Sequence, residues 1–158
     1  MEDGKLEEAR QIEAAAAKSR VQFELPVDHV VTDRIEPGTI NEVLPIAASA
    51  IGNRMGVDIG PATIKRYEAA IGDAKTVVWN GPMGVFEIEA FAAGTSAVAR
   101  AVAAVKGTTI IGGGDSIAAV KKAGVEDRIT HISTGGGASL EFLGGRTLPG
   151  VAALEEKT

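Results

Sequence analysis

Short apolar runs rich in β-branched residues alternate with longer stretches of helical periodicity over most of the chain. Such runs are typical of buried strands, and the stretches between them are typical of helices. The expected strands are residues 57–59, 76–79, 108–111 and 129–132, and the expected helices are residues 61–71, 87–105, 115–122 and 138–143. Gly94 interrupts the second of these helices, and Thr95 or Ser96 can cap its second part. A regular order of strand and helix requires crossover connections, so the predicted fold class is α/β. We expect a parallel sheet of about four to five strands with helices on both faces, as in part of a Rossmann-like three-layer domain.

The first third of the chain has a weaker pattern. Acidic residues precede an alanine-rich middle and a basic end in residues 3–18, which complements a helix dipole and predicts an opening helix. Residues 21–25 alternate like a strand, and residues 27–31 follow as a short extended piece. Prolines and glycines interrupt residues 32–53, so we expect mostly surface loop there, with one short helix near residues 40–44.

Composition narrows the class of protein. The 158 residues match the size of one domain, and with 45% hydrophobic but only 4% aromatic residues its core must consist of Val, Ile, Leu and Ala. The net charge of −5, without a basic run, argues against a nucleic-acid partner. There is no cysteine for a disulfide or a thiolate metal site, no secretory signal, and no apolar run of the ~20 residues that cross a bilayer. We therefore expect a soluble, cytoplasmic protein with no membrane partner.

Three glycine clusters carry the strongest functional signal. Each one follows an expected strand and precedes an expected helix, at residues 80–84, 112–114 and 135–137. A strand that ends in glycine before a helix exposes backbone N–H groups to an anion, and the helix dipole favours the same charge. Because the carboxyl ends of parallel strands meet at one edge of a sheet, the three clusters together predict one phosphate-rich ligand held by several loops.

The second and third clusters each allow two interpretations. Asp115 can cap its own helix or hold a hydrated Mg²⁺ that bridges phosphates, and Ser116 can donate to a phosphate oxygen or share the cap. Residues 135–137 have no acidic residue at the helix start, so their amides are available to an anion, with Thr134 and Ser139 as added donors. The alternative for these three glycines is a tight turn that needs positive φ.

The first cluster is the least like a turn. Val85 and Phe86 offer apolar surface to a base, and Glu87 can accept from ribose hydroxyls or lie solvated at a helix start. No lysine lies in or beside any cluster, so the Gly-x-x-x-x-Gly-Lys-Ser phosphate loop is absent. His29 and His131 have no metal-ligand companion at helical spacing and are interpreted as structural.

These motifs closely resemble those of phosphoglycerate kinase, from about Leu6 to the end of the chain. The matching segments are residues 25–28 (LPVD), 57–61 (VDIGP), 78–91 (VWNGPMGVFEIEAF), 111–116 (IGGGDS), 131–141 (HISTGGGASLE) and 148–151 (LPGV). The resemblance implies an α/β nucleotide-binding domain of an enzyme that transfers a phosphoryl group reversibly between 1,3-bisphosphoglycerate and Mg-ADP in glycolysis, giving 3-phosphoglycerate and ATP.

The resemblance also assigns roles to residues of this chain. It implies an adenosine pocket lined by Gly56 and by residues 80–85, among them Asn80, Pro82 and Val85, with Glu87 on the ribose. It makes Asp115 the carboxylate linked to Mg²⁺ through the nucleotide, ATP or ADP. The implied phosphate segment consists of Gly112, Gly113, Gly114, Asp115 and Ser116, and the implied helix N-terminus at the transferred phosphate consists of Gly135, Gly136 and Gly137.

The chain departs from the family in what it lacks. It contains no counterpart of the amino-terminal domain, with its basic patch and transfer arginine, or of the Gly-Gly-Ala-Lys-type loop. We therefore expect residues 1–158 to be the carboxyl-terminal, ATP/ADP-binding domain truncated at its N-terminal side, inactive alone, with 3-phosphoglycerate bound only when the missing domain is present. Two alternatives are a non-catalytic Mg-nucleotide-binding module and an assembly unit that pairs through an open sheet edge, although whole family members are usually monomeric.

Overall fold

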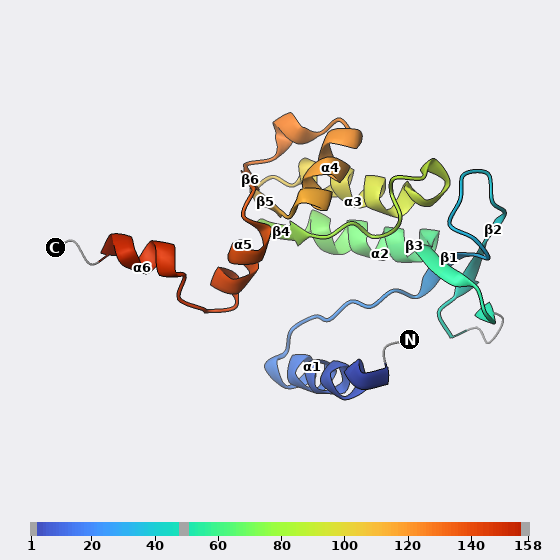
Figure 1. The fold of residues 1–158 in the computed structure, drawn as a ribbon, viewed down its shortest axis with the longest axis horizontal. Coiled ribbons are helices and arrows are strands. Elements are labelled where there is room, and N and C mark those ends of the chain that lie inside the picture. The colour runs from blue at the N-terminus through green and yellow to red at the C-terminus, as the bar shows by residue number, and fades with distance from the viewer. Residues whose placement is uncertain (1–2, 48–50, 156–158) are drawn as a thin grey trace.

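The computed structural model describes residues 3–47 and 51–155, which form two sheets of three strands each (Figure 1). The first sheet is antiparallel, with β1 (Asp28–Thr32) between β2 (Asn41–Pro45) and β3 (Met55–Ile59). The second sheet is parallel, with β5 (Thr108–Gly112) between β4 (Thr76–Asn80) and β6 (His131–Ser133).

Helices connect and flank the strands. They are α1 (Leu6–Ser19), α2 (Pro61–Gly72), α3 (Ala93–Ala104), α4 (Gly114–Lys122), α5 (Gly136–Leu143) and α6 (Pro149–Glu155), with 3-10 turns at Asp3–Lys5, Glu89–Phe91 and Glu126–Arg128. Among the residues that the structure describes, no helix is long and apolar enough to cross a membrane.

The main core lies between the parallel sheet and the layer of α2, α3 and α4. Trp79 and Ile111 point from the sheet toward Val98, Val102 and Val120 of the helices, and all five are at most 6% exposed. Each fully buried aliphatic side chain contributes roughly 1.5–3 kcal/mol, so this layer is the most firmly held part of the chain.

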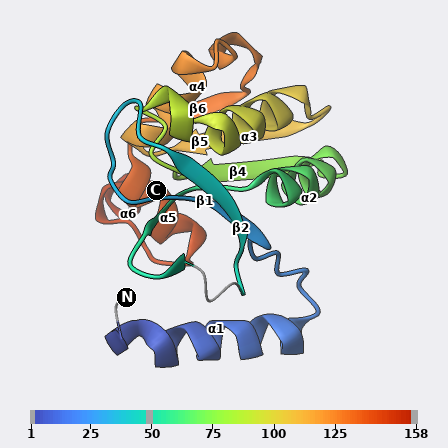
Figure 2. The same ribbon diagram turned by 90° about the vertical axis from the view of Figure 1, so that its right-hand side faces the viewer.

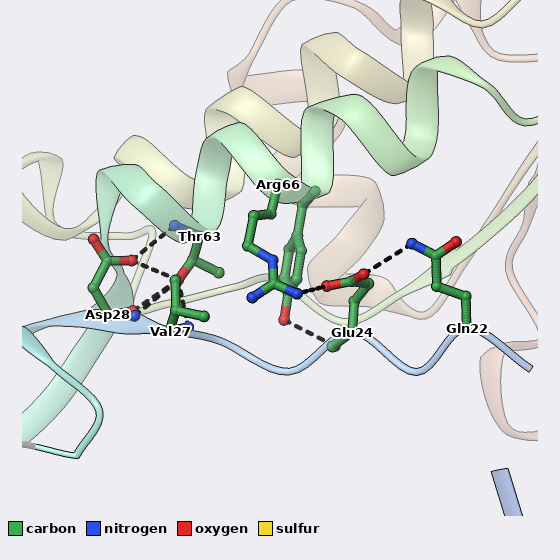
Figure 3. A network of polar contacts seen from close by, with 7 residues as sticks. Gln22, Glu24, Val27, Asp28, Thr63 and Arg66 are labelled. Carbon is green, nitrogen blue, oxygen red and sulfur yellow. Dashed lines mark hydrogen bonds and ion pairs between the residues drawn. The ribbon is translucent and has the colours of Figure 1, made fainter. Parts of the chain in front are cut away.

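A buried carboxylate joins the antiparallel sheet to α2. Asp28 accepts from the backbone N–H groups of Ala62 (2.9 Å) and Thr63 (2.7 Å), which satisfies free amides at the start of the helix. Figure 3 shows the contact of Asp28 with Thr63. Burial raises the pKa of Asp28, but the hydrogen bonds from the Thr63 hydroxyl and from the two amides outweigh it and leave the pKa below its ordinary value. Farther along α2, Arg66 pairs with Glu24 and so holds the extended segment before β1 against the helix.

The opposite side of the parallel sheet is more open. Helix α5 lies on it, whereas α1 has no buried residue and lies apart from both sheets at the end of an extended segment (Figures 1 and 2). Val78 on this side is 43% exposed.

The predicted α/β class and the parallel strands near residues 76–79, 108–111 and 129–132 are confirmed, but the parallel sheet has three strands rather than four to five. The expected strand at 57–59 is present as β3 and belongs to the antiparallel sheet. The extended piece at 27–31 is confirmed as β1.

Three local predictions are wrong. Residues 21–25 form no strand, and residues 40–44 form most of β2 instead of a short helix, because they pair with β1. The helix expected from residue 87 begins only at Ala93, after a 3-10 turn, and neither Thr95 nor Ser96 caps it.

Candidate functional site

The parallel sheet places the three glycine clusters at one edge. Strands β4, β5 and β6 end at Asn80, Gly112 and Ser133, and the register pairs Asn80 with Gly112 and Gly112 with Ser133. The clusters therefore begin side by side at the carboxyl ends of adjacent strands, where α/β proteins form ligand sites.

The first and second clusters are in direct contact. The backbone N–H of Gly81 donates to Ser116 Oγ at 2.6 Å, and Ser116 is only 1% exposed. Gly113 has a φ of +89°, and a Cβ on it would lie 2.7 Å from Asn80 Oδ1. The backbone conformation at position 113 therefore favours glycine, whereas the contact with Asn80 can be relieved by a movement of that exposed side chain.

The third cluster packs on the second. A Cβ on Gly136 would lie 2.7 Å from Gly113 Cα and 2.8 Å from Gly113 N, and neither backbone atom has room to move aside. Gly113 thus contacts both of the other clusters. The positive-φ alternative for residues 135–137 is wrong, because none of these three glycines has a positive φ; the close approach of two backbones explains Gly136 instead.

The amides of the first cluster are already used within the protein. Met83 and Gly84 donate to Thr95 Oγ1 at 3.0 and 3.3 Å, and Val85 donates to the backbone oxygen of Val57 at 2.8 Å. This cluster is a fixed loop and not an anion cradle. Gly56 precedes Val57 in β3 and is exposed beside the loop.

Side chains of the first cluster divide between core and surface. Phe86 is 7% exposed and belongs to the main core, so the prediction that it faces a base is wrong. Val85 is half-buried, Pro82 is half-buried, and Asn80 and Glu87 are exposed. Lys122 donates from the end of α4 to the backbone oxygen of Phe86 at 2.6 Å, a contact that the sequence did not reveal.

A second residue that sequence reasoning missed is Asp58. Its carboxylate is 5% exposed and accepts from the backbone N–H groups of Ile59 (2.9 Å) and Gly94 (2.7 Å). Burial raises its pKa, and the two hydrogen bonds oppose that shift only in part. A Cβ on Gly84 would lie 2.4 Å from the backbone oxygen of Val57 and 2.6 Å from Asp58 Oδ1, so the first cluster packs closely on β3 here. The same carboxylate holds the start of α3 through Gly94. An acidic residue inside the apolar run Val57–Ile59 was the available signal.

The second and third clusters leave their helix N-termini open. Neither α4 nor α5 has a side-chain cap, so the capping interpretation of Asp115 is wrong. Asp115 is exposed, and within the described part of the chain its side chain makes no hydrogen bond or ion pair. Two helix dipoles with free first-turn amides thus reach the same edge, a combination that suits an anionic ligand.

The other candidate donors differ in availability. Ser139 Oγ lies 2.6 Å from Ser133 Oγ, so these hydroxyls pair with each other, while Thr134 is exposed. In residues 3–47 and 51–155 no group of three His, Asp or Glu side chains could hold a metal ion by itself. A cation at Asp115 would need further ligands from the bound molecule.

Comparison with known proteins agrees with this geometry. The family model described as "Phosphoglycerate kinase" matches residues 1–146. Curated phosphoglycerate kinases from Pseudothermotoga lettingae and Rippkaea orientalis are each 54% identical over 99% of this chain, and the chain spans about 40% of the length of each. The solved phosphoglycerate kinase of Coxiella burnetii matches 92% of this chain with a TM-score of 0.87 and 43% identity, and that of Pyrococcus horikoshii matches 96% with a TM-score of 0.80 and 35% identity. The chain covers 38% and 37% of those two structures.

Proposed function

The chain belongs to the phosphoglycerate kinase family, and from this premise we propose that it supplies the nucleotide side of reversible phosphoryl transfer between 1,3-bisphosphoglycerate and Mg-ADP. The observation that carries the proposal is the contact of all three glycine clusters through Gly113 at one sheet edge. In this proposal residues 1–158 are the carboxyl-terminal part of the ATP/ADP-binding domain.

The nucleotide would lie along α4, from its carboxyl end to its amino end. Lys122 and the backbone of Phe86 and Glu87 meet at one end of this helix, and Asp115 lies at the other, roughly 10 Å away along the axis at 1.5 Å per residue. The adenosine would lie against Gly56, Asn80, Pro82 and Val85, with its ribose hydroxyls accepted by the exposed Glu87.

The phosphates would lie at the open start of α4. The amides of Gly113, Gly114 and Asp115 are aligned with the helix dipole, and Gly112 brings the backbone close. Ser116 is nearly fully buried, so its hydroxyl supports the loop by accepting from Gly81. The exposed Asp115 carboxylate is the ligand suited to Mg²⁺, which, when bound, neutralises charge on the phosphate oxygens.

The transferred phosphate would face the start of α5. The amides of Gly135, Gly136 and Gly137 are positioned to stabilise charge that develops during in-line transfer, without covalent participation of the protein. The acid substrate would bind to the part of a family member that this chain does not include, so we expect the isolated chain to be inactive.

Calorimetry with ADP and ATP, each with and without Mg²⁺, tests nucleotide binding. We expect weak binding that Mg²⁺ strengthens, and we expect Asp115→Asn to remove the effect of Mg²⁺. Asp127→Asn is the matched control, because Asp127 is also an exposed acid but lies in the 3-10 turn after α4. No heat at millimolar nucleotide would overturn the binding proposal, and near-normal turnover in a coupled assay would overturn the expected inactivity.

A further inference from the structure

Asn80 and Gly81, where β4 meets the first glycine cluster, form the one Asn-Gly pair in the chain. The other asparagines, Asn41 and Asn53, precede residues with long side chains. In an Asn-Gly pair the glycine has no Cβ to shield its backbone nitrogen, so that nitrogen reaches the side-chain carbonyl of the asparagine more easily than in other pairs. Among the asparagines of this chain, Asn80 is therefore the one most prone to spontaneous deamidation.

Deamidation of this pair needs no reactant except water. The Gly81 nitrogen loses its proton and attacks Cγ of Asn80, a bond forms between these two atoms, and the bond from Cγ to Nδ2 breaks. Ammonia leaves with the displaced proton, and a succinimide ring remains. Water then opens the ring, at Cγ to give aspartate or at the backbone carbonyl carbon to give isoaspartate. Either product carries a negative charge that Asn80 lacks.

The Asn80 side chain is accessible for this reaction. It is exposed, and in residues 3–47 and 51–155 its amide makes no hydrogen bond. Its Oδ1 lies at the second cluster, since a Cβ on Gly113 would come within 2.7 Å of it and a Cβ on Gly112 within 3.5 Å. A carboxylate in place of this amide would therefore lie directly beside the glycines at the start of α4.

The Gly81 nitrogen, in contrast, is restrained. Its N–H donates to Ser116 Oγ at 2.6 Å, and Ser116 is only 1% exposed, so water competes poorly for this hydrogen bond. Loss of the proton, the first step of the reaction, breaks the bond. Asn80 also ends β4 in register with Gly112, and an extended residue holds its side chain away from the next backbone nitrogen. The ring therefore closes only when the end of the strand opens.

We propose that Asn80-Gly81 is a deamidation site of this protein, and that the Ser116 hydroxyl, in the first turn of α4, protects it by holding the Gly81 amide. The consequence for nucleotide rests on the proposed function. A carboxylate at position 80 would repel the phosphates expected at the start of α4, so deamidation would weaken the nucleotide site irreversibly.

The test follows all asparagines of the 158-residue chain by peptide mapping with mass spectrometry during prolonged incubation in mildly alkaline buffer. A synthetic peptide of residues 77–84 gives the unrestrained rate at the same pair. We expect Asn80 to be modified before Asn41 and Asn53 in the folded chain. Its rate should be about tenfold or more below that of the peptide, because strand pairing and the Ser116 hydrogen bond both oppose ring closure.

Two serine variants make the test specific. Ser116→Ala removes the acceptor of the Gly81 amide and should raise the rate at Asn80 about fivefold, which corresponds to the loss of one buried hydrogen bond. Ser133→Ala is the matched control, because Ser133 ends β6 at the same edge of the sheet but its hydroxyl pairs with Ser139. Hydrogen exchange of the Gly81 amide in wild type tests the same bond even where Ser116→Ala does not fold.

Several results would overturn the proposal. An Asn80 that stays unmodified even in folded Ser116→Ala excludes the site. The protective role of Ser116 is excluded by equal rates in wild type and Ser116→Ala, by equal acceleration in both serine variants, or by a Gly81 amide that exchanges as fast as in the peptide.

The effect on nucleotide is measured separately. Asn80→Asp should weaken Mg-ADP binding about fivefold at low salt and less at high salt, because the added charge repels the phosphates. Asn41→Asp, at an exposed position in β2, should leave binding unchanged. Equal affinity of wild type and Asn80→Asp overturns only this consequence. A wild-type chain that binds no nucleotide overturns the proposed function, whereas the deamidation rates still decide the modification site.

Discussion

The contact of the three glycine clusters predicts that two neighbouring glycines will respond in opposite ways to the same substitution. Gly113 has a φ of +89° and lies against Asn80, whereas an added Cβ on Gly114 meets no atom within 4 Å. Gly113→Ala forces alanine into a backbone region that is almost exclusive to glycine, at a cost of about 1–3 kcal/mol. Gly114→Ala, in the first turn of α4, restricts only the unfolded chain and should stabilise the protein by about 0.4–1 kcal/mol.

The expected difference between the two variants is large enough to measure. The loss of unfolded-state entropy offsets part of the strain in Gly113→Ala, which leaves a net destabilisation on the order of 1–2 kcal/mol. The free energies of unfolding of the two variants should therefore differ by about 2 kcal/mol, or roughly 4–8 °C in Tm for a domain of this size. Helix α4 carries Val120, which is fully buried, so global unfolding reports on its amino end.

Urea unfolding followed by circular dichroism gives both free energies, with unchanged m-values as the check that only stability has altered. Equal stability of the two variants would refute the geometry at Gly113. A destabilised Gly114→Ala would show that the start of α4 is more crowded than the structure indicates.

Three further predictions concern side chains that hold the site. Asp28→Asn should destabilise the protein by about 0.5–2 kcal/mol, because it weakens the cap of α2. Folding lowers the pKa of Asp28, so the stability that this carboxylate contributes is present above about pH 4 and is lost as pH falls toward the folded pKa. Unfolding measured during acid titration should therefore show a smaller loss of stability in the variant than in wild type. Asp58→Asn should destabilise by about 1–3 kcal/mol, because the amide nitrogen faces a donor at Ile59 or Gly94. Since folding raises the pKa of Asp58, wild type loses stability as pH rises from about 4 through the folded pKa. The difference in the free energy of unfolding between wild type and Asp58→Asn should therefore become smaller across this pH range. Lys122→Met should cost no more than about 1 kcal/mol but should speed amide hydrogen exchange near Phe86, since the lysine holds that backbone oxygen from a partly exposed position.

Elements whose buried side chains form an apolar run along the chain could be predicted from the sequence. Strands β4 and β5 are apolar runs whose core-facing side chains lie under α3 and α4, so neighbouring residues already carry the signal. The segment Asn41–Pro45 has no such signal, because it becomes a strand by pairing with β1, from which a long loop separates it. Residues 21–25 alternate but lack a partner strand, and alternation alone forms no sheet.

The candidate site shows the same division. The glycine clusters were visible in the sequence, since strand, glycine and helix are consecutive. The reasons for individual glycines were not visible, because Gly113 and Gly136 meet only after the crossover from β5 through α4 to β6 has formed. The role of Asp58 could not be predicted for a related reason, because its partners Gly84 and Gly94 are distant in sequence. Phe86 was placed at the surface by its position in a loop, although the fold turns it into the core.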